Sequence, residues 1–176
     1  LADFDGDLSV VSGATPLLTS ATLDDLLRAH REASALATVL TAEVAEPIGY
    51  GRIVRSATGE LLRIVEELEA TPQERQIHEI NAGVYCFAAP ALFKALQTIR
   101  PSAVKGELYL PDAIALLRDR DGGVQARLAP DPDEVRGVNT RAELAEIHRL
   151  LWRKTAMRLL TEGVTLLDPE RTYIGP

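Results

Sequence analysis

Short apolar runs alternate with amphipathic stretches along this chain, which is the pattern of an α/β fold. Residues 7–12 (DLSVVS) and 36–41 (LATVLT) have the length and apolar character of buried strands, and residues 22–33 between them have helical periodicity. The predicted helical face holds Leu23, Leu26, Leu27 and His30. A strand, a helix and a strand in this order predict a parallel crossover connection.

The middle of the chain predicts a hairpin followed by further strands and helices. Residues 50–55 (YGRIVR) and 61–66 (LLRIVE) flank the glycine-containing loop 56–60, as the two strands of a hairpin do. Thr71 followed by Pro72 and Glu74 predicts a short helix, because the three residues supply a cap and a favourable first turn. The remaining patterns predict strands at 80–87 and 124–128 and helices at 90–98 and 110–118.

The C-terminal part predicts a long helix and then a different structure. Residues 141–161 are amphipathic, Asn139-Thr140 can cap their start, and Gly163 is a typical helix stop. The following segment, residues 164–169 (VTLLDP), has strand character. We therefore expect a mixed-sheet domain over 1–140, a linker helix over 141–162 and the start of another domain over 163–176.

Composition narrows the class of function. With 176 residues and 46% hydrophobic residues, the chain can bury a core. A net charge of -7 argues against nucleic-acid binding, which depends on clustered Lys and Arg. No apolar run reaches the roughly 20 residues of a membrane helix, and no signal peptide opens the chain, so we expect a cytoplasmic protein without a membrane partner.

Cysteine and histidine offer little for metal or redox chemistry. Cys86 is the single cysteine, so an intramolecular disulfide and a cysteine-based zinc cluster are excluded. It lies in an apolar run and is predicted to be a buried structural thiol. His30, His78 and His148 lack ligand spacing and are predicted to be surface or half-buried residues.

Five segments carry a resemblance to a known family because of their sequence and their fixed order. They are SGATPL (12–17), PIGYGRI (47–53), IVE (64–66), EINAG (79–83) and GVNTR (137–141). In this order they resemble the bifunctional N-acetylglucosamine-1-phosphate uridyltransferase / glucosamine-1-phosphate acetyltransferase family. The tail EGVTLLDP (162–169) is similar to that family's join to a left-handed β-helix.

The resemblance implies a fold and an activity. It implies a Rossmann-like nucleotidyltransferase core with a mixed sheet whose N-terminal part is missing here, then a linker helix and a stub of a β-helix domain. The family transfers UMP from UTP to N-acetylglucosamine 1-phosphate with Mg²⁺, giving UDP-N-acetylglucosamine and pyrophosphate for peptidoglycan and lipopolysaccharide precursors. Its second activity is an acetyl transfer, and a homotrimer is expected only for the full-length protein.

The resemblance also implies four binding residues and no covalent catalytic residue. Gly51, Glu66 and Asn81 would hold the sugar, and Asn139 would meet both the metal and the sugar phosphate. These types suit the task, since a carboxylate and an amide recognise hydroxyls and a glycine backbone permits close approach. An amide at a helix start suits a phosphate and a hard cation. Taken singly, Glu66 could be a surface carboxylate, Asn139 a helix cap and Gly51 a turn residue.

Two departures from the family predict impaired uridylyl transfer. The family's glycine-rich triphosphate loop has no counterpart in this sequence, so we expect the chain to be an internal piece of a longer protein. The family's second metal position is an aspartate, and Ala14 stands there. Two alternatives remain open, namely another sugar-1-phosphate nucleotidyltransferase and a non-catalytic sugar-phosphate-binding module.

Overall fold

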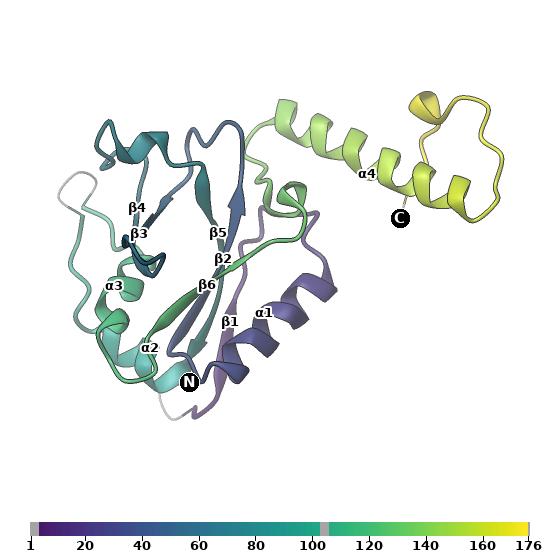
Figure 1. Cartoon of the computed structure of the whole chain (residues 1–176). Coiled ribbons are helices and arrows are strands. Elements are labelled where there is room, and N and C mark those ends of the chain that lie inside the picture. The colour runs from purple at the N-terminus through teal and green to yellow at the C-terminus, as the bar shows by residue number, and fades with distance from the viewer. Residues whose placement is uncertain (1–3, 103–105, 176) are drawn as a thin grey trace. The chain divides into compact units, whose positions relative to one another are not determined.

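The computed structural model describes residues 4–102 and 106–175, which form two compact units. Unit 1 comprises the chain up to Ser12 together with Thr19–Pro132, and unit 2 comprises Gly13–Leu18 together with the chain from Asp133 onward. The chain from N-terminus to C-terminus can be followed in Figure 1 by colour.

Unit 1 is built on a mixed sheet in which β5 is the central strand. The strands are β1 (Asp7–Val10), β2 (Ala37–Glu43), β3 (Arg52–Arg55), β4 (Leu61–Val65), β5 (Glu79–Ala88) and β6 (Val124–Leu128). The order is β4-β3-β5-β2-β6, with β1 also paired to β5. β5 is antiparallel to β1, β2 and β3, whereas β2 and β6 are parallel. β1 and β2 therefore run in the same direction, as predicted, but β5 lies between them.

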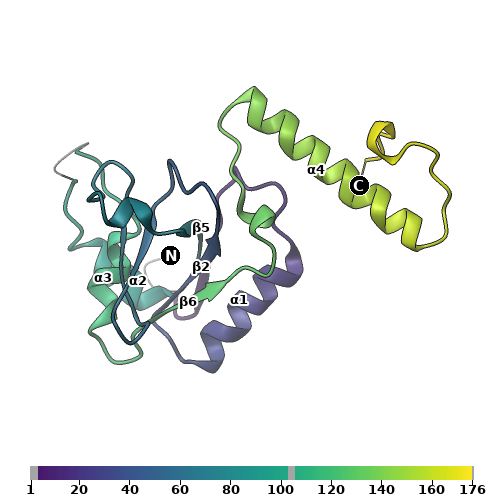
Figure 2. The same ribbon diagram turned by 45° about the horizontal axis from the view of Figure 1, so that its top comes forward.

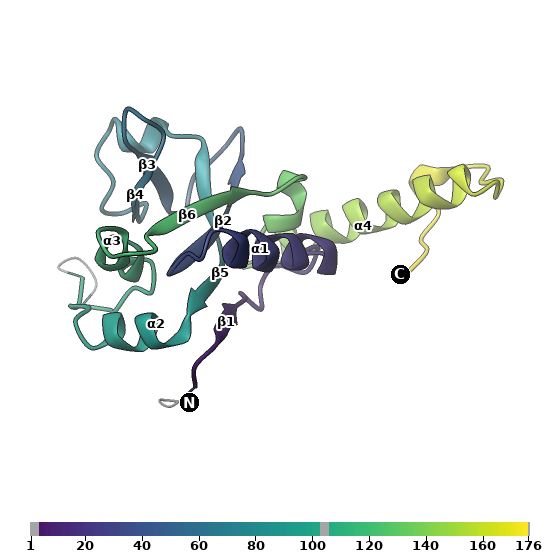
Figure 3. The same ribbon diagram turned by 60° about the horizontal axis from the view of Figure 1, so that its bottom comes forward.

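The helices of unit 1 cover both faces of the sheet (Figures 2 and 3). They are α1 (Ser20–Glu32), α2 (Ala89–Leu96) and α3 (Asp112–Arg118), and the single-turn helix η1 spans Glu74–Gln76. His30 of α1 contacts Thr38, whereas α2 and α3 belong to a cluster with Ala37 and Val39. Successive side chains of a strand point to opposite faces, so α1 lies on one face and α2 with α3 on the other.

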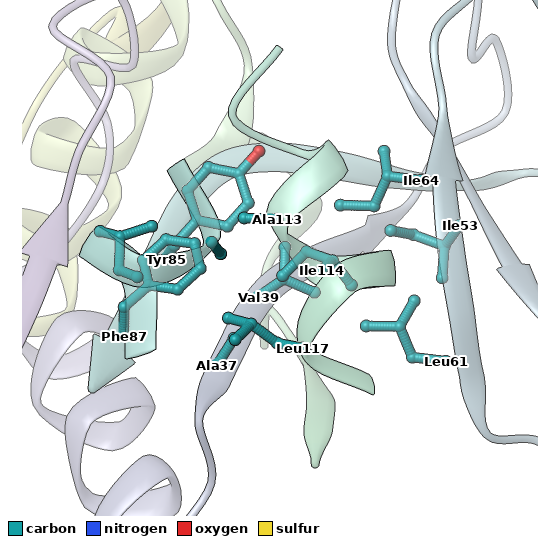
Figure 4. Packing of buried hydrophobic residues seen from close by; sticks show 12 residues of the cluster. Ala37, Val39, Ile53, Leu61, Ile64, Tyr85, Phe87, Ala113, Ile114 and Leu117 are labelled. Atoms are coloured by element: carbon teal, nitrogen blue, oxygen red, sulfur yellow. The ribbon is translucent and has the colours of Figure 1, made fainter. Parts of the chain in front are cut away.

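The apolar cluster between the sheet and α2 and α3 is the core of unit 1 (Figure 4). It includes Val39, Tyr85, Phe87, Ile114 and Leu117, each at most 3% exposed. Figure 4 shows the ring of Tyr85 beside that of Phe87, and their centroids are 5.5 Å apart. The core therefore fixes the strand that carries EINAG.

The prediction for Cys86 is confirmed, and the prediction for His30 is wrong. Cys86 is buried and forms no disulfide, and burial raises the pKa of its thiol. His30 is 2% exposed, because the helical face that it shares with the leucines packs on the sheet. Its Nδ1 lies 2.9 Å from the Thr38 hydroxyl, so a polar partner is present at the buried position.

Unit 2 is dominated by α4 (Arg141–Thr161), preceded by the single-turn helix η2 (Pro132–Val135). Thr140 and Glu143 form a reciprocal capping box at its start. The predicted strand at 164–169 is wrong, since the described residues 163–175 contain only the short helix η3 (Pro169–Arg171). Asp168 caps η3 through the Arg171 amide, and Pro169 favours a first helical turn. The β-helix start stays a prediction.

Over the described residues, no helix combines the length and the apolar character needed to cross a membrane.

Candidate functional site

Three of the four predicted binding residues lie together at one end of the sheet in unit 1. Gly51 precedes β3, Glu66 follows β4 and Asn81 lies near the start of β5. Arg52 pairs with both Val65 and Ile80, so the three strand ends meet at this point. The backbone amide of Asn81 donates to the Gly51 carbonyl oxygen at 2.9 Å. This group is called the strand-end cluster below.

Glycine suits position 51 because a side chain there would be crowded, and not because the backbone adopts a positive φ. A methyl group added there would lie 3.1 Å from Ile64 Cγ2, 3.2 Å from Glu66 Oε1 and 3.5 Å from Asn81 Cβ. Gly51 is not among the glycines with positive φ, whereas the nearby Gly49 has φ 85°. The turn conformation therefore belongs to Gly49, and the missing side chain of Gly51 leaves room for the Glu66 carboxylate.

The side chain of Asn81 is held by two hydrogen bonds. Its Nδ2 donates to the Tyr85 hydroxyl oxygen at 2.7 Å, and its Oδ1 accepts from the Gly83 amide at 3.0 Å. Burial raises the pKa of the Tyr85 phenol well above its usual value, the hydrogen bond from Asn81 opposes this, and the negative charge of Glu66 adds to it. The phenol therefore stays protonated.

An ion pair between the buried Arg52 and the partly exposed Glu67 connects the segments that carry Gly51 and Glu66. Arg52 is 1% exposed, and its Nη2 donates to Glu67 Oε2 at 2.6 Å. The same oxygen accepts from the Gly49 amide at 3.2 Å. The Arg52 bond is the main cause that holds the pKa of Glu67 below its usual value, against desolvation.

Sequence reasoning missed this pair. Arg52 directly follows Gly51 and Glu67 directly follows Glu66, so opposite charges beside two motif residues were the available signal. Arg52 also donates from Nη1 to the Tyr50 carbonyl oxygen. Its Nε is the one buried side-chain nitrogen or oxygen without a hydrogen-bond partner in the described chain.

Asn139 and Ala14 are neighbours in unit 2, although they are far apart in sequence. The Val138 amide donates to the Ala14 carbonyl oxygen at 2.9 Å. The backbone amides of Asn139 and Thr140 both donate to Glu143 Oε2, each at 2.7 Å, and these bonds lower the pKa of Glu143. The amides that were expected to attract a phosphate are thus held by a carboxylate. A common site for Asn139 and the strand-end cluster stays a prediction.

The residues at the predicted metal position do not fit Mg²⁺. The Ala14 side chain has no oxygen, and its carbonyl oxygen already accepts from Val138. Among the described residues, no group of three or more His, Cys, Asp or Glu side chains could hold a metal ion. Asn139 alone is a poor site, because Mg²⁺ in proteins is usually bound by one or two carboxylates.

A cavity in unit 2 contains none of the predicted site residues. It has a volume of about 690 Å³ and lies in unit 2 between α4 and the η3 segment. Trp152 stacks there with His148 at 5.5 Å and meets Tyr173 at 4.5 Å between ring centroids. The candidate site therefore depends on the contacts of the strand-end cluster and not on cavity size.

A family model and individual relatives place this chain in the same family. Residues 3–126 match the family described as Nucleotidyl transferase. The chain is 46% identical over 167 residues to a bifunctional protein GlmU from Halalkalibacterium halodurans, covering 95% of this chain. It is 44% identical over 174 residues to the protein of that name from Pelotomaculum thermopropionicum, covering 99%. The chain spans 37% and 38% of the length of these relatives.

Solved structures support the fold alone, because their sequence identity is low. A protein from Bacillus anthracis, assigned as a glucose-1-phosphate thymidylyltransferase, superposes with a TM-score of 0.60 at 17% identity. That match covers 96% of this chain and 61% of the other. A UDP-glucose pyrophosphorylase gives a TM-score of 0.50 at 18% identity, covering 64% of this chain and 42% of the other. Together with the family match over residues 3–126, these matches confirm the predicted α/β nucleotidyltransferase core.

Proposed function

This chain belongs to the nucleotidyl transferase family, and we propose that it carries the amino-sugar part of a uridylyltransferase site. The predicted resemblance to the bifunctional family is confirmed by the GlmU relatives. The proposed reaction of the whole protein joins UTP and N-acetylglucosamine 1-phosphate. A phosphate oxygen of the sugar would attack the α-phosphorus of UTP, a new P–O bond would form, and pyrophosphate would leave.

The meeting of Gly51, Glu66 and Asn81 is the observation that carries this proposal. Glu66 brings acceptor oxygens beside Gly51, and Asn81 brings an amide with both donor and acceptor capacity. Such groups in fixed positions suit the hydroxyl and acetamido groups of an amino sugar. The proposal keeps Asn139 as the residue that contacts the sugar phosphate.

Positioning and not covalent catalysis is the contribution expected from this chain. Transfer between phosphates gains most from holding the reactants in line and from neutralising charge. Ala14 supplies no carboxylate for a divalent metal, so no metal-dependent step is assigned to this chain. Ala14 also favours a second candidate function, a module that binds the sugar phosphate without turnover.

Calorimetric titration of the 176-residue chain with N-acetylglucosamine 1-phosphate tests the proposal. We expect saturable binding, weakened about tenfold by Asn81→Ala or Glu66→Gln, as the loss of one charged or well-placed hydrogen bond predicts. The matched control is Glu60→Gln in the exposed β3–β4 loop, which should leave the affinity unchanged. Absence of binding by the unaltered chain, or equal affinity of all variants, would contradict the proposal.

Turnover separates the two candidate functions. Pyrophosphate release in the presence of UTP and N-acetylglucosamine 1-phosphate would exclude a pure binding module. Binding without release would favour it.

A further inference from the structure

β5 contains a bulge between two residues that contact each other. Val39 pairs with Tyr85 and Thr41 pairs with Asn81, so one residue of β2 faces three residues of β5 in between. Gly83 lies at the centre of these three and has φ 70°, a conformation that glycine adopts at little cost. Bulges of this kind redirect side chains and are frequent beside binding sites.

The bulge is what allows Asn81 and Tyr85 to touch. Four residues of a regular strand span about 13 Å, so the side chains of residues i and i+4 normally stand well apart. Here the two extra residues of β5 shorten the path, and Asn81 Nδ2 lies 2.7 Å from the Tyr85 hydroxyl oxygen. A contact between these two side chains is therefore a product of the local backbone and not of the strand pattern.

The orientation of the Asn81 amide follows from its partners. The Gly83 amide can only donate, so the atom 3.0 Å from it must be the oxygen Oδ1. Nδ2 then faces Tyr85, whose hydroxyl oxygen accepts. Each of these bonds uses one Nδ2 hydrogen or one Oδ1 lone pair, and it thereby fixes the direction of the second hydrogen and the second lone pair. These second groups are suited to an acetamido or hydroxyl group of a ligand.

We propose that Tyr85 is a positioning residue, whose hydroxyl fixes the Asn81 amide for recognition of an amino-sugar phosphate. This inference rests on the proposed function of the strand-end cluster. Tyr85 is 3% exposed and its ring stacks on Phe87, so its hydroxyl has a fixed place (Figure 4). Tyr85 itself belongs to the core, and it acts on the ligand through Asn81.

Tyr85→Phe tests the inference, because it removes one oxygen and keeps the packed ring. Titration with N-acetylglucosamine 1-phosphate should show a dissociation constant raised about fivefold, the effect of one lost hydrogen bond in a network. Nitrogen-15 NMR of the ligand-free chain should show shifted and faster-exchanging side-chain amide signals of Asn81. Tyr173→Phe is the matched control, since Tyr173 is 68% exposed and belongs to unit 2.

A merely structural role of Tyr85 would lower stability without moving the Asn81 signals. Unchanged Asn81 side-chain signals in Tyr85→Phe, or an unchanged dissociation constant, would overturn the inference. If the unaltered chain itself fails to bind the sugar phosphate, the proposed function fails, and the role of Tyr85 in recognition fails with it. The Asn81 signals then still report separately whether the Tyr85 hydroxyl orients that amide.

Discussion

At the residue scale, contacts of single atoms determine how the side chains of the candidate site are placed. The space beside Gly51 is filled by a carboxylate oxygen of Glu66 and by Asn81, and the Asn81 amide is turned by one backbone amide and one phenol. None of these contacts depends on an unusual residue type. They depend on the absence of a side chain at Gly51 and on the presence of the Tyr85 hydroxyl.

Gly51→Ala should weaken both binding and folding. The new methyl group would lie 3.2 Å from Glu66 Oε1 and 3.1 Å from Ile64 Cγ2, so both side chains would move by a few tenths of an ångström. We expect a several-fold loss of affinity for N-acetylglucosamine 1-phosphate and a stability loss of about 1 kcal/mol. Calorimetry and urea unfolding measure the two effects, with Gly175→Ala as control. Equal affinity of Gly51→Ala and the parent chain would be the contrary result.

His30 should make stability depend on pH. Burial is the largest cause that lowers its pKa, Asp7 opposes this, and Arg31 adds to it. The unfolded state, with a histidine pKa of about 6.5, then binds more protons than the folded state below that pH. The contribution of His30 to the free energy of unfolding should therefore be constant above about pH 6.5 and should fall as the pH drops toward the lowered pKa.

Urea unfolding from pH 5 to 8 measures this dependence. His30→Gln should remove most of the slope that sets in below about pH 6.5, whereas the exposed His148→Gln should retain it. Asp7, which faces His30 Nε2 at 3.6 Å, belongs to the same network. An identical slope in all three proteins would show that His30 does not cause it.

At the element scale, the candidate site is formed by the ends of three strands and by the bulge in β5. The cluster forms where β3, β4 and β5 begin or end, and the bulge of β5 aims Asn81. The Arg52–Glu67 pair then links the first residue of β3 to the segment after β4. Regular strands without these features would carry the same residues on separate parts of the sheet.

Gly83→Ala should cost stability and also disturb Asn81. Its added methyl group has room, with Ser12 Cβ at 3.7 Å, so the cost comes from φ 70° and should be about 1–2 kcal/mol. Gly59→Ala is a matched control, because Gly59 has φ 89° in the β3–β4 loop. Both variants should lose similar stability in urea unfolding, but only Gly83→Ala should shift the Asn81 side-chain amide signals. A shift of those signals in both variants would argue against a local role of the bulge.

At the scale of the whole molecule, a hydrogen bond between segments far apart in sequence brings positions 14 and 139 near each other. The segment Gly13–Leu18 belongs to the same unit as the C-terminal helix, and the Ala14 carbonyl oxygen accepts from the Val138 amide. The segments that carry the two predicted metal positions, 14 and 139, are thus hydrogen-bonded to each other, and of these two residues only Asn139 has an oxygen in its side chain.

Ala14→Asp should create a divalent-cation site. The new carboxylate would stand beside the segment of Asn139, and a carboxylate with an amide oxygen and waters is a common set for Mg²⁺. Titration with Mn²⁺ should broaden the backbone NMR signals of Val138 and Asn139 in Ala14→Asp at concentrations about tenfold below those needed in the parent chain. Ala14→Asn is the control without added charge. Equal broadening in all three would mean that Ala14 does not limit cation binding.

The sequence by itself determined the order of elements, the buried thiol and the family, because periodicity, capping residues and ordered motifs are local properties. The strand predicted at 164–169 failed, because its apolar residues have no sheet to join among the described residues and Asp168 caps a helical turn instead. Tertiary structure alone decided that His30 is buried, that Arg52 pairs with Glu67 and that Tyr85 holds Asn81. Each of these contacts joins strands or faces whose register and bulges are set by packing, so no pattern along the chain could specify them.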